Sequence, residues 1–360
     1  MSGRSWLWNN FPWRAAALLL PGSITIFVLH RFRAPDRRVS GTDPAALAEA
    51  LEYLRHHRVP IWDLTTLLQQ AAAGEPFPAR GVVFTVDDGY ADFPEVGMPV
   101  FAAFDSPVTL FVPTGFIDRD YWFWWDRLEY AFMRTDRGMV ELDQGPAPIR
   151  FDCTTPEGRR ASVRSLMQLT ALPHADKPGV FRRLEAALGV PIPDAPPPES
   201  EPASWDALRA AVPHGLRCGP HTVTHPILWT ASAEVMAAEI SGSMTTLRER
   251  MPAGYTDVFA YPQGSLSRRE LDYLAAIRCP AALLSDGGSV RLREHLRSNP
   301  AARFLIPRQG FEDPVHRHRQ AIYGIERLKQ RVWSAAGRSP PRWRGRTPDG
   351  ASPLARSLPA

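Results

Sequence analysis

Two aspartates, Asp87 and Asp88, stand side by side directly after the apolar segment GVVFTV. Adjacent carboxylates repel each other, so this pair needs a nearby cation or a separate role for each member. Far downstream, the segment HTVTH places His221 and His225 four residues apart. On a helix or in a suitable loop, that spacing brings two imidazoles to one point, as a divalent metal requires. One aspartate and two histidines leave coordination positions open for water and substrate, and the second aspartate can then act as general base.

Each part of this pattern also has a plain structural explanation. The two aspartates could serve a helix cap or a turn, and both histidines could be surface residues. Cys218 stands three residues before His221, which invites a metal interpretation for the thiol as well. We interpret Cys218 instead as a small apolar residue of the core, which is the commoner role of a lone cysteine. It is therefore the combination of the Asp-Asp pair with HTVTH that indicates a hydrolytic metal site.

The elements that must position these residues alternate between strands and helices. Apolar and β-branched segments predict strands over residues 23–32, 81–86, 107–116, 257–264 and 302–311. Capping residues predict helices that begin after Asp43 and Ser204, and a further helix that ends on Gly74. Such an alternation indicates a parallel β/α architecture, whose functional residues gather at the carboxyl ends of the strands. Asp87 and Asp88 lie at such an end.

Residues 117–204 interrupt the alternation. This insertion contains a proline-rich surface loop and a run of four consecutive aromatic residues, Trp122, Phe123, Trp124 and Trp125. Aromatic side chains bury large apolar areas, so we expect this run to belong mostly to the core. The alternative is that some of its rings line a sugar-binding cleft by stacking.

The two ends of the chain are expected to lie outside one large domain. Residues 1–22 predict an N-terminal helix or arm, residues 23–333 a barrel domain, and residues 334–360 a disordered tail without apolar periodicity. The apolar run AAALLL near the N-terminus is far shorter than the ~20 residues needed to span a bilayer, and no signal-cleavage pattern follows it. We therefore expect a cytoplasmic protein, with export, or peripheral membrane contact through the N-terminal segment, as the alternatives.

Composition excludes several other classes of protein. The formal net charge of the 360-residue chain is +4, and no basic stripe interleaved with aromatic residues indicates nucleic-acid binding. The 3 cysteines are odd in number and widely spaced, so no disulfide framework is implied.

Three motifs in this order resemble those of the NodB-type polysaccharide deacetylases, carbohydrate esterase family four. They are TVDDGYADF, HTVTHP and FAYPQG, and the flanking segments FVLHRF and FLIPRQGF are similar to the first and last strands of that family. The resemblance covers roughly residues 23–312. It implies an α/β fold, a distorted (β/α)7-type barrel, and hydrolysis of N- or O-acetyl groups on an acetylated glycan.

The resemblance also implies a role for each residue of the first two motifs. Asp87 matches the catalytic base of the family, and Asp88 matches its metal-binding aspartate. His221 and His225 match the two metal-binding histidines, and the implied cofactor is a divalent metal, for which we expect Zn²⁺. In this family the metal polarises the acetyl carbonyl and acidifies the water from which the base takes a proton.

The third motif departs from the family pattern. The arginine that often orients the base aligns with Ala260, in the recurring FAYP variant of the motif. We expect Arg308, from the last strand, to supply the missing guanidinium. The backbone N–H of Gln263 matches the oxyanion donor of the family, and Tyr261 is expected to contribute to the same oxyanion or substrate contact.

The histidine that supplies the general acid in this family has no evident counterpart near the C-terminus. His316 and His318 lie in the charged segment VHRHRQ, which predicts a solvated helix rather than part of a site. His30 follows the first strand at a position where relatives with this strand carry a histidine. We therefore expect His30 to be the general acid, with a purely structural role as the alternative.

Together these features predict a metal-dependent deacetylase that acts on a bacterial polysaccharide or its precursor, in the biosynthesis of an exopolysaccharide or surface glycan. Two alternatives stay open. One is a catalytically impaired glycan-binding protein on the same fold, because of Ala260 and the missing late histidine. The other is a hydrolase of different C–N bonds, such as those of imides or formamides.

Overall fold

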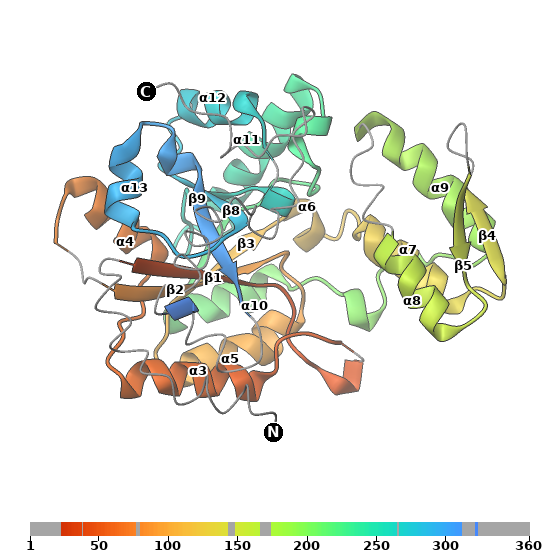
Figure 1. Cartoon of the computed structure of the whole chain (residues 1–360), viewed down its shortest axis with the longest axis horizontal. Coiled ribbons are helices and arrows are strands. Elements are labelled where there is room, and N and C mark those ends of the chain that lie inside the picture. Colours follow the sequence, from red (N-terminus) through yellow and green to blue (C-terminus); the bar gives the residue numbers. More distant parts are fainter. Residues whose placement is uncertain are drawn as a thin grey trace, which may run out of the picture.

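The computed structural model describes residues 23–37, 39–76, 80–142, 148–165, 174–264, 266–311 and 321–322. Its central feature is a seven-stranded sheet with the order β6-β3-β2-β1-β9-β8-β7, in which all neighbours are parallel (Figure 1). The strands are β1 (Ser23–Leu29), β2 (Arg80–Asp87), β3 (Val108–Val112), β6 (Leu216–Pro220), β7 (Phe259–Ala260), β8 (Ala282–Gly287) and β9 (Ile306–Gly310).

The two ends of this sheet approach each other, so that it forms a nearly closed barrel. Cys218 of β6 forms a parallel bridge with Tyr255, just before β7. The Cys218 N–H donates to the Gly254 carbonyl at 2.8 Å, and the Thr256 N–H donates to the Cys218 carbonyl at 2.9 Å. We refer to this junction of β6 with residues 254–256 as the seam. The predicted seven-stranded, distorted β/α barrel is confirmed.

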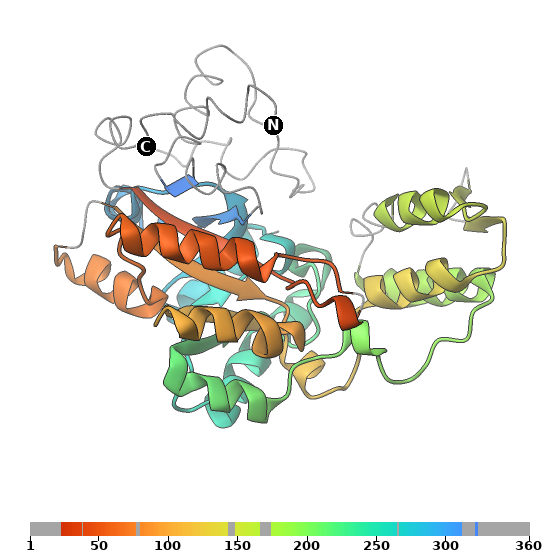
Figure 2. The same cartoon turned by 90° about the horizontal axis from the view of Figure 1, so that it is seen from below.

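Helices surround the sheet. They are α3 (Pro44–His56), α4 (Leu64–Ala73), α5 (Met98–Ala103), α6 (Thr114–Ile117), α10 (Trp205–Ala211), α11 (Ala233–Arg250), α12 (Arg268–Ala276) and α13 (Leu292–Ser298) (Figures 1 and 2). The Asp43 carboxylate accepts the Ala45 N–H at the start of α3, and Gly74 ends α4 in the left-handed conformation. Both predicted helix boundaries are therefore confirmed.

Side-chain alternation on β2 decides what faces the barrel interior. Val82, Phe84 and Val86 pack in one cluster with residues of α3 and α5. Successive strand residues point to opposite faces, so Thr85 and Asp87 point to the other face. The sheet thus exposes its last polar residue to the interior, at the carboxyl end of the barrel.

The segment between α6 and α10 folds into a small unit of its own. It contains α7 (Trp124–Arg134), the antiparallel hairpin of β4 (Met139–Leu142) and β5 (Ile149–Asp152), α8 (Pro156–Ser165) and α9 (Lys177–Leu188). These elements share a separate apolar cluster that includes Leu128, Phe132, Phe151 and Leu184. Figure 1 shows this unit beside the barrel, with α7 nearest to it.

Several predicted elements differ from those observed. The strand expected over 107–116 ends at Val112, because α6 begins at Thr114, and β9 begins only at Ile306, after a helical turn. The strand β8 and the helices α12 and α13 were not predicted. The expected N-terminal arm (1–22), the expected tail (334–360), His316 and His318 lie outside the described residues.

No helix within the described ranges combines the length and the apolar character needed to cross a bilayer.

Candidate active site

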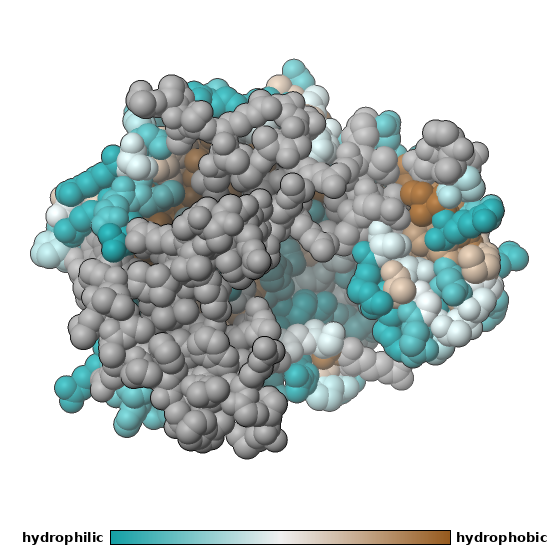
Figure 3. Space-filling view, in the orientation of Figure 1, coloured by the Kyte–Doolittle hydropathy of each residue, from teal (hydrophilic) through white to brown (hydrophobic). Residues whose placement is uncertain are grey.

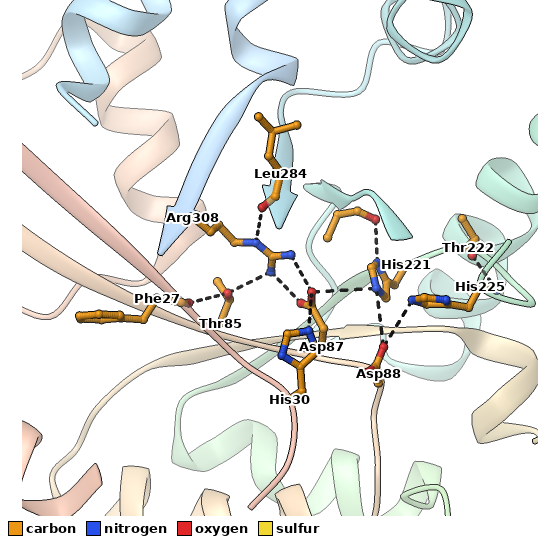
Figure 4. A network of polar contacts seen from close by, with 11 residues as sticks. Phe27, His30, Thr85, Asp87, Asp88, His221, Thr222, His225, Leu284 and Arg308 are labelled. Carbon is orange, nitrogen blue, oxygen red and sulfur yellow. Dashed lines mark hydrogen bonds and ion pairs between the residues drawn. The ribbon is translucent and has the colours of Figure 1, made fainter. Parts of the chain in front are cut away.

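Asp87, the last residue of β2, is held by Arg308 of β9 at the centre of the site (Figure 4). The two terminal nitrogens of Arg308 donate to the two carboxylate oxygens of Asp87, at 2.7 and 2.6 Å. The same guanidinium donates from Nη1 to the Thr85 hydroxyl at 3.1 Å and from Nε to the Leu284 carbonyl at 2.6 Å. The contact between Arg308 and Asp87 that the sequence predicts is therefore present, across the neighbouring strand β1.

The contact with Arg308 keeps the Asp87 carboxylate ionised although it is buried. Burial by itself would raise the pKa of Asp87, but the charge and hydrogen bonds of Arg308 outweigh burial and lower that pKa to about 2. Arg308 is fully buried and Asp87 is 2% exposed. Bidentate pairing of this kind fixes the orientation of a carboxylate as well as its charge.

Asp88 turns away from Asp87 toward the two histidines. It adopts a left-handed conformation with φ of 76°, and Gly89 follows with φ of 79°. A Cβ atom on Gly89 would also come within 2.9 Å of Val112 and Ile117, so glycine is required at this turn. The turn lets two adjacent carboxylates point to different partners.

The Asp88 carboxylate, His221 and His225 form a buried group whose ligand atoms all lie within 4.8 Å of one another. Asp88 Oδ1 lies 3.5 Å from His225 Nε2 and 3.9 Å from His221 Nε2 (Figure 4). Among the described residues, this is the one cluster of three such side chains that could hold a metal ion.

The protonation states of these groups fit a divalent cation. The Ala260 carbonyl lies 2.7 Å from His221 Nδ1 and can only accept, so Nδ1 carries the proton and the lone pair of Nε2 points at Asp88. Burial lowers the pKa of His221 to about 4 and that of His225 well below its usual value, so both rings are neutral. Burial, followed by repulsion from Asp87, raises the pKa of Asp88. Without a cation the Asp88 carboxyl group therefore favours its protonated form, and a bound metal ion would replace that proton and accept the lone pairs of Asp88, His221 and His225.

Glu239 of α11 holds the loop that carries the two histidines. One carboxylate oxygen accepts the N–H groups of Val223 and Thr224, each at 2.8 Å, and the other accepts the Thr224 hydroxyl at 2.5 Å. This loop contains left-handed backbone at Thr222 (φ 70°) and His225 (φ 56°), so it needs outside support. Glu239 was not predicted from the sequence, although a glutamate on the buried face of a helix, beside Ile240, is a signal that could have identified it.

His30 follows β1 and lies on the open side of Asp87. Its Nε2 is 4.0 Å from Asp87 Oδ2, and its side chain is 50% exposed. His221 Nε2 also lies 4.0 Å from Asp87 Oδ2, on the side where Asp88 and His225 lie. His30 is thus an imidazole at the mouth of the site that is not part of the group with Asp88.

Of the two residues expected from the third motif, Gln263 lies at the carboxyl end of the barrel, whereas the Tyr261 side chain is buried away from the site. Gln263 lies in the turn after β7, with left-handed backbone (φ 54°), at the carboxyl end of the barrel. Tyr261 is fully buried on the outer side of β7, where its ring packs against Phe259, and its N–H donates to the Leu283 carbonyl. The expected oxyanion or substrate contact of Tyr261 is therefore wrong in this structure, because strand alternation turns its side chain away from the site.

The aromatic run of the insertion divides between core and site. Trp122 and Phe123 are 3% and 1% exposed, as expected for core residues, whereas Trp124 and Trp125 are half-buried. The Trp125 ring lies 5.0 Å from the His225 ring and stacks on Phe123 at 4.2 Å. The insertion therefore supplies one wall of the candidate active site.

A chain of hydrogen bonds fixes this wall to β2. Trp125 Nε1 donates to the Tyr90 hydroxyl at 3.2 Å, and that hydroxyl donates to Asp126 Oδ2 at 2.9 Å. Burial raises the pKa of Asp126 to about 7, because the hydrogen bond from Tyr90 offsets burial only in part. Arg31 lies 3.7 Å over the Tyr90 ring.

Comparison with known proteins extends this picture. The model of a family described as polysaccharide deacetylase matches residues 74–281. A poly-beta-1,6-N-acetyl-D-glucosamine N-deacetylase of Escherichia coli (strain K12) is 28% identical over 110 residues, which are 26% of this chain and 16% of that protein. The present chain thus spans only 16% of the length of this curated relative in the match.

Two solved structures share the fold. The Streptococcus pyogenes deacetylase PplD, in complex with acetate, has a TM-score of 0.53 at 15% identity, over 85% of this chain and 98% of that one. IcaB from Ammonifex degensii has a TM-score of 0.50 at 14% identity, over 84% of this chain and 97% of that one. At these identities the likeness concerns the arrangement of the backbone.

Proposed function

Because this chain belongs to the polysaccharide deacetylase family, we propose that it removes N-linked acetyl groups from a β-linked N-acetylglucosamine exopolysaccharide. The observation that carries this proposal is the side-by-side placement of an ionised Asp87 and the group of Asp88, His221 and His225. The choice of N-acetylglucosamine polymer is supported by the curated relative, whose substrate is poly-β-1,6-N-acetyl-D-glucosamine.

Asp87 is the base in this proposal. Its carboxylate is ionised at neutral pH, since its pKa is about 2, and Arg308 fixes both oxygens. Each oxygen keeps a second lone pair that can accept a proton from the attacking water. Arg308 positions the base and so takes the role that the family's arginine at the place of Ala260 would have.

Asp88, His221 and His225 hold the divalent metal, for which we propose Zn²⁺ because two imidazoles and one carboxylate suit that ion. When bound, the cation supplies polarisation of the acetyl carbonyl and a lowered pKa of water. The backbone N–H of Gln263, in the turn after β7, is the second donor that we propose for the oxyanion.

His30 is the proposed source of the proton that the leaving nitrogen needs. Hydrolysis of an N-acetyl group adds the oxygen of water to the acetyl carbon and breaks the C–N bond, so the leaving nitrogen must receive a proton. His30 lies 4.0 Å from Asp87 and is half exposed, on the side from which substrate arrives. We propose that it donates this proton, so that acetate and a free amine leave the site.

Two further proposals concern the setting of the reaction. We propose that the enzyme acts during exopolysaccharide biosynthesis, at the cytoplasmic side, with peripheral membrane contact through residues 1–22. The alternative of an inactive glycan-binding protein depended on Ala260 and on the missing late histidine. The contact of Arg308 with Asp87 removes the first of these two grounds and so favours the enzyme.

The test is acetate release from β-1,6-linked N-acetylglucosamine oligomers, with O-acetylated oligomers as the comparison. We expect release from the N-acetylated oligomer, loss of release after treatment with a chelator, and recovery after addition of Zn²⁺. The variant Asp87→Asn, which keeps the shape of the side chain, should release no acetate. Oligomer binding without any acetate release by the metal-loaded protein would instead identify a glycan-binding protein.

A further inference from the structure

Three half-buried aromatic rings extend from the candidate active site onto the insertion: Trp125 and Trp124 of α7, and Phe181 of α9. We propose that these rings, called here the aromatic platform, bind sugar units of the polysaccharide next to the unit that is deacetylated. The proposal rests on the proposed function for the identity of the glycan. It assigns to the insertion the recognition of a polymer rather than of a single sugar.

The first ring of the platform, Trp125, lies beside His225. The Trp125 and His225 rings are 5.0 Å apart at an interplanar angle of 71°. One face of Trp125 lies on the buried Phe123 ring at 4.2 Å and 11°, and its indole nitrogen is held by the Tyr90 hydroxyl. Trp125 is therefore fixed in orientation at the rim of the site, rather than free to rotate.

The platform continues away from the metal site. The rings of Trp124 and Trp125 are 5.6 Å apart and nearly perpendicular, at 82°. Trp124 then stacks on Phe181 at 4.6 Å and 7°. Figure 1 shows α7 and α9 side by side in the insertion, next to the barrel. Since His225 belongs to the barrel and Phe181 to α9, the contacts between the rings lead from the barrel into the insertion. Figure 3 shows a recessed, mostly hydrophilic surface beside the insertion.

The three rings pack against the apolar clusters of the barrel and the insertion but are less buried than the members of those clusters. Their neighbours Trp122 and Phe123 already fill the core, at 3% and 1% exposed, while the three platform rings keep contact with solvent. Rigid aromatic faces cost little conformational entropy on binding, and the apolar C–H face of a pyranose can cover such a face. A polysaccharide that extends from the metal site along α7 would therefore meet one ring after another.

The experiment compares a polymer-like substrate with a single sugar. The probes are a β-1,6-linked N-acetylglucosamine pentamer and methyl N-acetylglucosaminide, and the readout is acetate release. In Trp124→Ala and in Phe181→Ala, we expect the ratio of kcat/KM for the pentamer to kcat/KM for the single sugar to fall about 10-fold, mainly through KM. Trp124→Phe keeps a ring and should recover most of the ratio.

The matched control is Tyr130→Ala. Tyr130 is also a half-buried aromatic residue of α7, but its ring packs under Arg134 rather than along the platform. We expect the wild-type ratio in this variant. An unchanged ratio in both Trp124→Ala and Phe181→Ala would overturn the proposal, as would an equal fall in Tyr130→Ala.

A binding measurement separates this inference from the proposed function. Calorimetric titration of the pentamer into Asp87→Asn needs no catalysis, and we expect about 10-fold weaker binding when Trp124→Ala is added. If the wild type released no acetate but this loss of affinity occurred, the proposed function would fail and the platform would stand. Equal affinity with and without Trp124 would remove the platform whatever the activity.

Discussion

Asp87 remains charged inside the barrel because one arginine satisfies both of its oxygens. A buried carboxylate without a partner is costly, and loss of one partner of a buried pair costs more than loss of a surface pair. Arg308 also donates to Thr85 and to the Leu284 carbonyl, so its own position is fixed by two strands. Orientation of Asp87, the proposed base, and stability of the barrel thus depend on the same side chain.

Replacement of Arg308 by Ala should therefore affect both activity and stability. We expect kcat/KM for acetate release to fall about 100-fold, because the base loses its orientation, and the unfolding free energy to fall by about 3–5 kcal/mol. Arg308→Lys keeps the positive charge but not the paired contact, so its kcat/KM and its unfolding free energy should lie between those of the wild type and Arg308→Ala. Denaturant unfolding and acetate assays measure the two effects. A folded Arg308→Ala protein with the wild-type rate would refute the positioning role.

Replacement of His30 by Ala should slow the hydrolysis of substrates with poor leaving groups more than that of substrates with good ones. An amine must be protonated as it leaves, whereas 4-nitrophenolate leaves unaided, so the need for an acid differs between the two substrates. We expect His30→Ala to lose about 100-fold in acetate release from an N-acetylated oligomer and little in hydrolysis of 4-nitrophenyl acetate. Equal losses on both substrates would assign His30 a structural role instead.

The individual site residues were predictable to different degrees. Asp87, Asp88, His221 and His225 belong to short motifs, and Arg308 was predictable because Ala260 leaves the base without an arginine. Glu239 was not predicted, since its contacts depend on how α11 packs against the histidine loop. Tyr261 was assigned wrongly, because its position beside Gln263 in the sequence does not reveal which face of β7 it occupies.

At the scale of elements, the histidine loop depends on α11. Glu239 accepts three hydrogen bonds from two adjacent residues of the loop, which joins a strained backbone to a rigid helix. Groups that orient metal ligands in this way typically contribute 10- to 100-fold to metal affinity. The helix thus acts on the metal through the backbone between the two histidines.

We expect Glu239→Ala to weaken Zn²⁺ binding by about 10- to 100-fold, with a smaller effect in Glu239→Gln, which keeps one acceptor oxygen. Competition with a chromophoric chelator measures this affinity without an activity assay. Glu249→Ala removes the same charge from an exposed position of the same helix and serves as the control. Equal Zn²⁺ affinity in Glu239→Ala and in Glu249→Ala would contradict the role of Glu239.

The first turn of α7 carries a pH-dependent contact with the barrel. The pKa of Asp126 rises from 3.8 to about 7, chiefly through burial, so the folded protein binds a proton that the unfolded chain releases. This contribution to stability is complete below about pH 4 and is lost as the pH rises through about 7. Protonated Asp126 still accepts the hydrogen bond from Tyr90.

Asp126→Asn should remove this dependence. In chelator-treated protein, we expect the unfolding free energy of the wild type to fall between pH 5 and pH 7 by on the order of 2 kcal/mol more than that of the variant. Denaturant unfolding at the two pH values gives both numbers. The exposed Asp136→Asn should behave like the wild type. Parallel pH curves for the wild type and Asp126→Asn would show that this carboxyl group is ionised in the folded state.

The elements themselves followed from sequence to the extent that local signals decide them. Continuous apolar segments predicted β2 and β3, and capping residues predicted the starts of α3 and α10. The strand β7 has only two paired residues, Phe259 and Ala260, because the chain turns at once toward the site. The unpredicted strand β8 has no β-branched residue, so its pairing with β7 and β9, rather than local preference, makes it a strand.

At the scale of the whole molecule, the candidate metal site lies across the seam of the barrel. His221 follows β6 and donates to the Ala260 carbonyl of β7, and these strands stand at opposite ends of the sheet order. Between them the backbone contributes the two hydrogen bonds of Cys218 with Gly254 and Thr256. A ligand that fixes His221 should therefore also tighten the closure of the barrel.

We expect the amide hydrogens of Cys218 and Thr256 to exchange more slowly with solvent in the Zn²⁺-loaded protein than in chelator-treated protein. Amides that pair β1 with β2, away from the seam, should be protected equally in both states. Hydrogen exchange read by mass spectrometry or NMR makes this comparison. His221→Ala should exchange at the faster rate with or without Zn²⁺. Equal exchange at the seam in both states of the wild type would separate metal binding from barrel closure.

The pairing of Arg308 with Asp87 has a consequence for how the protein is made. The two residues are 221 positions apart, and the guanidinium comes from the last strand of the barrel. While a ribosome is still translating the chain before β9, Asp87 has no partner, and a buried, unpaired carboxylate opposes docking of the strands around it. We therefore expect a chain that ends before β9 to fold incompletely around Asp87 and to release no acetate.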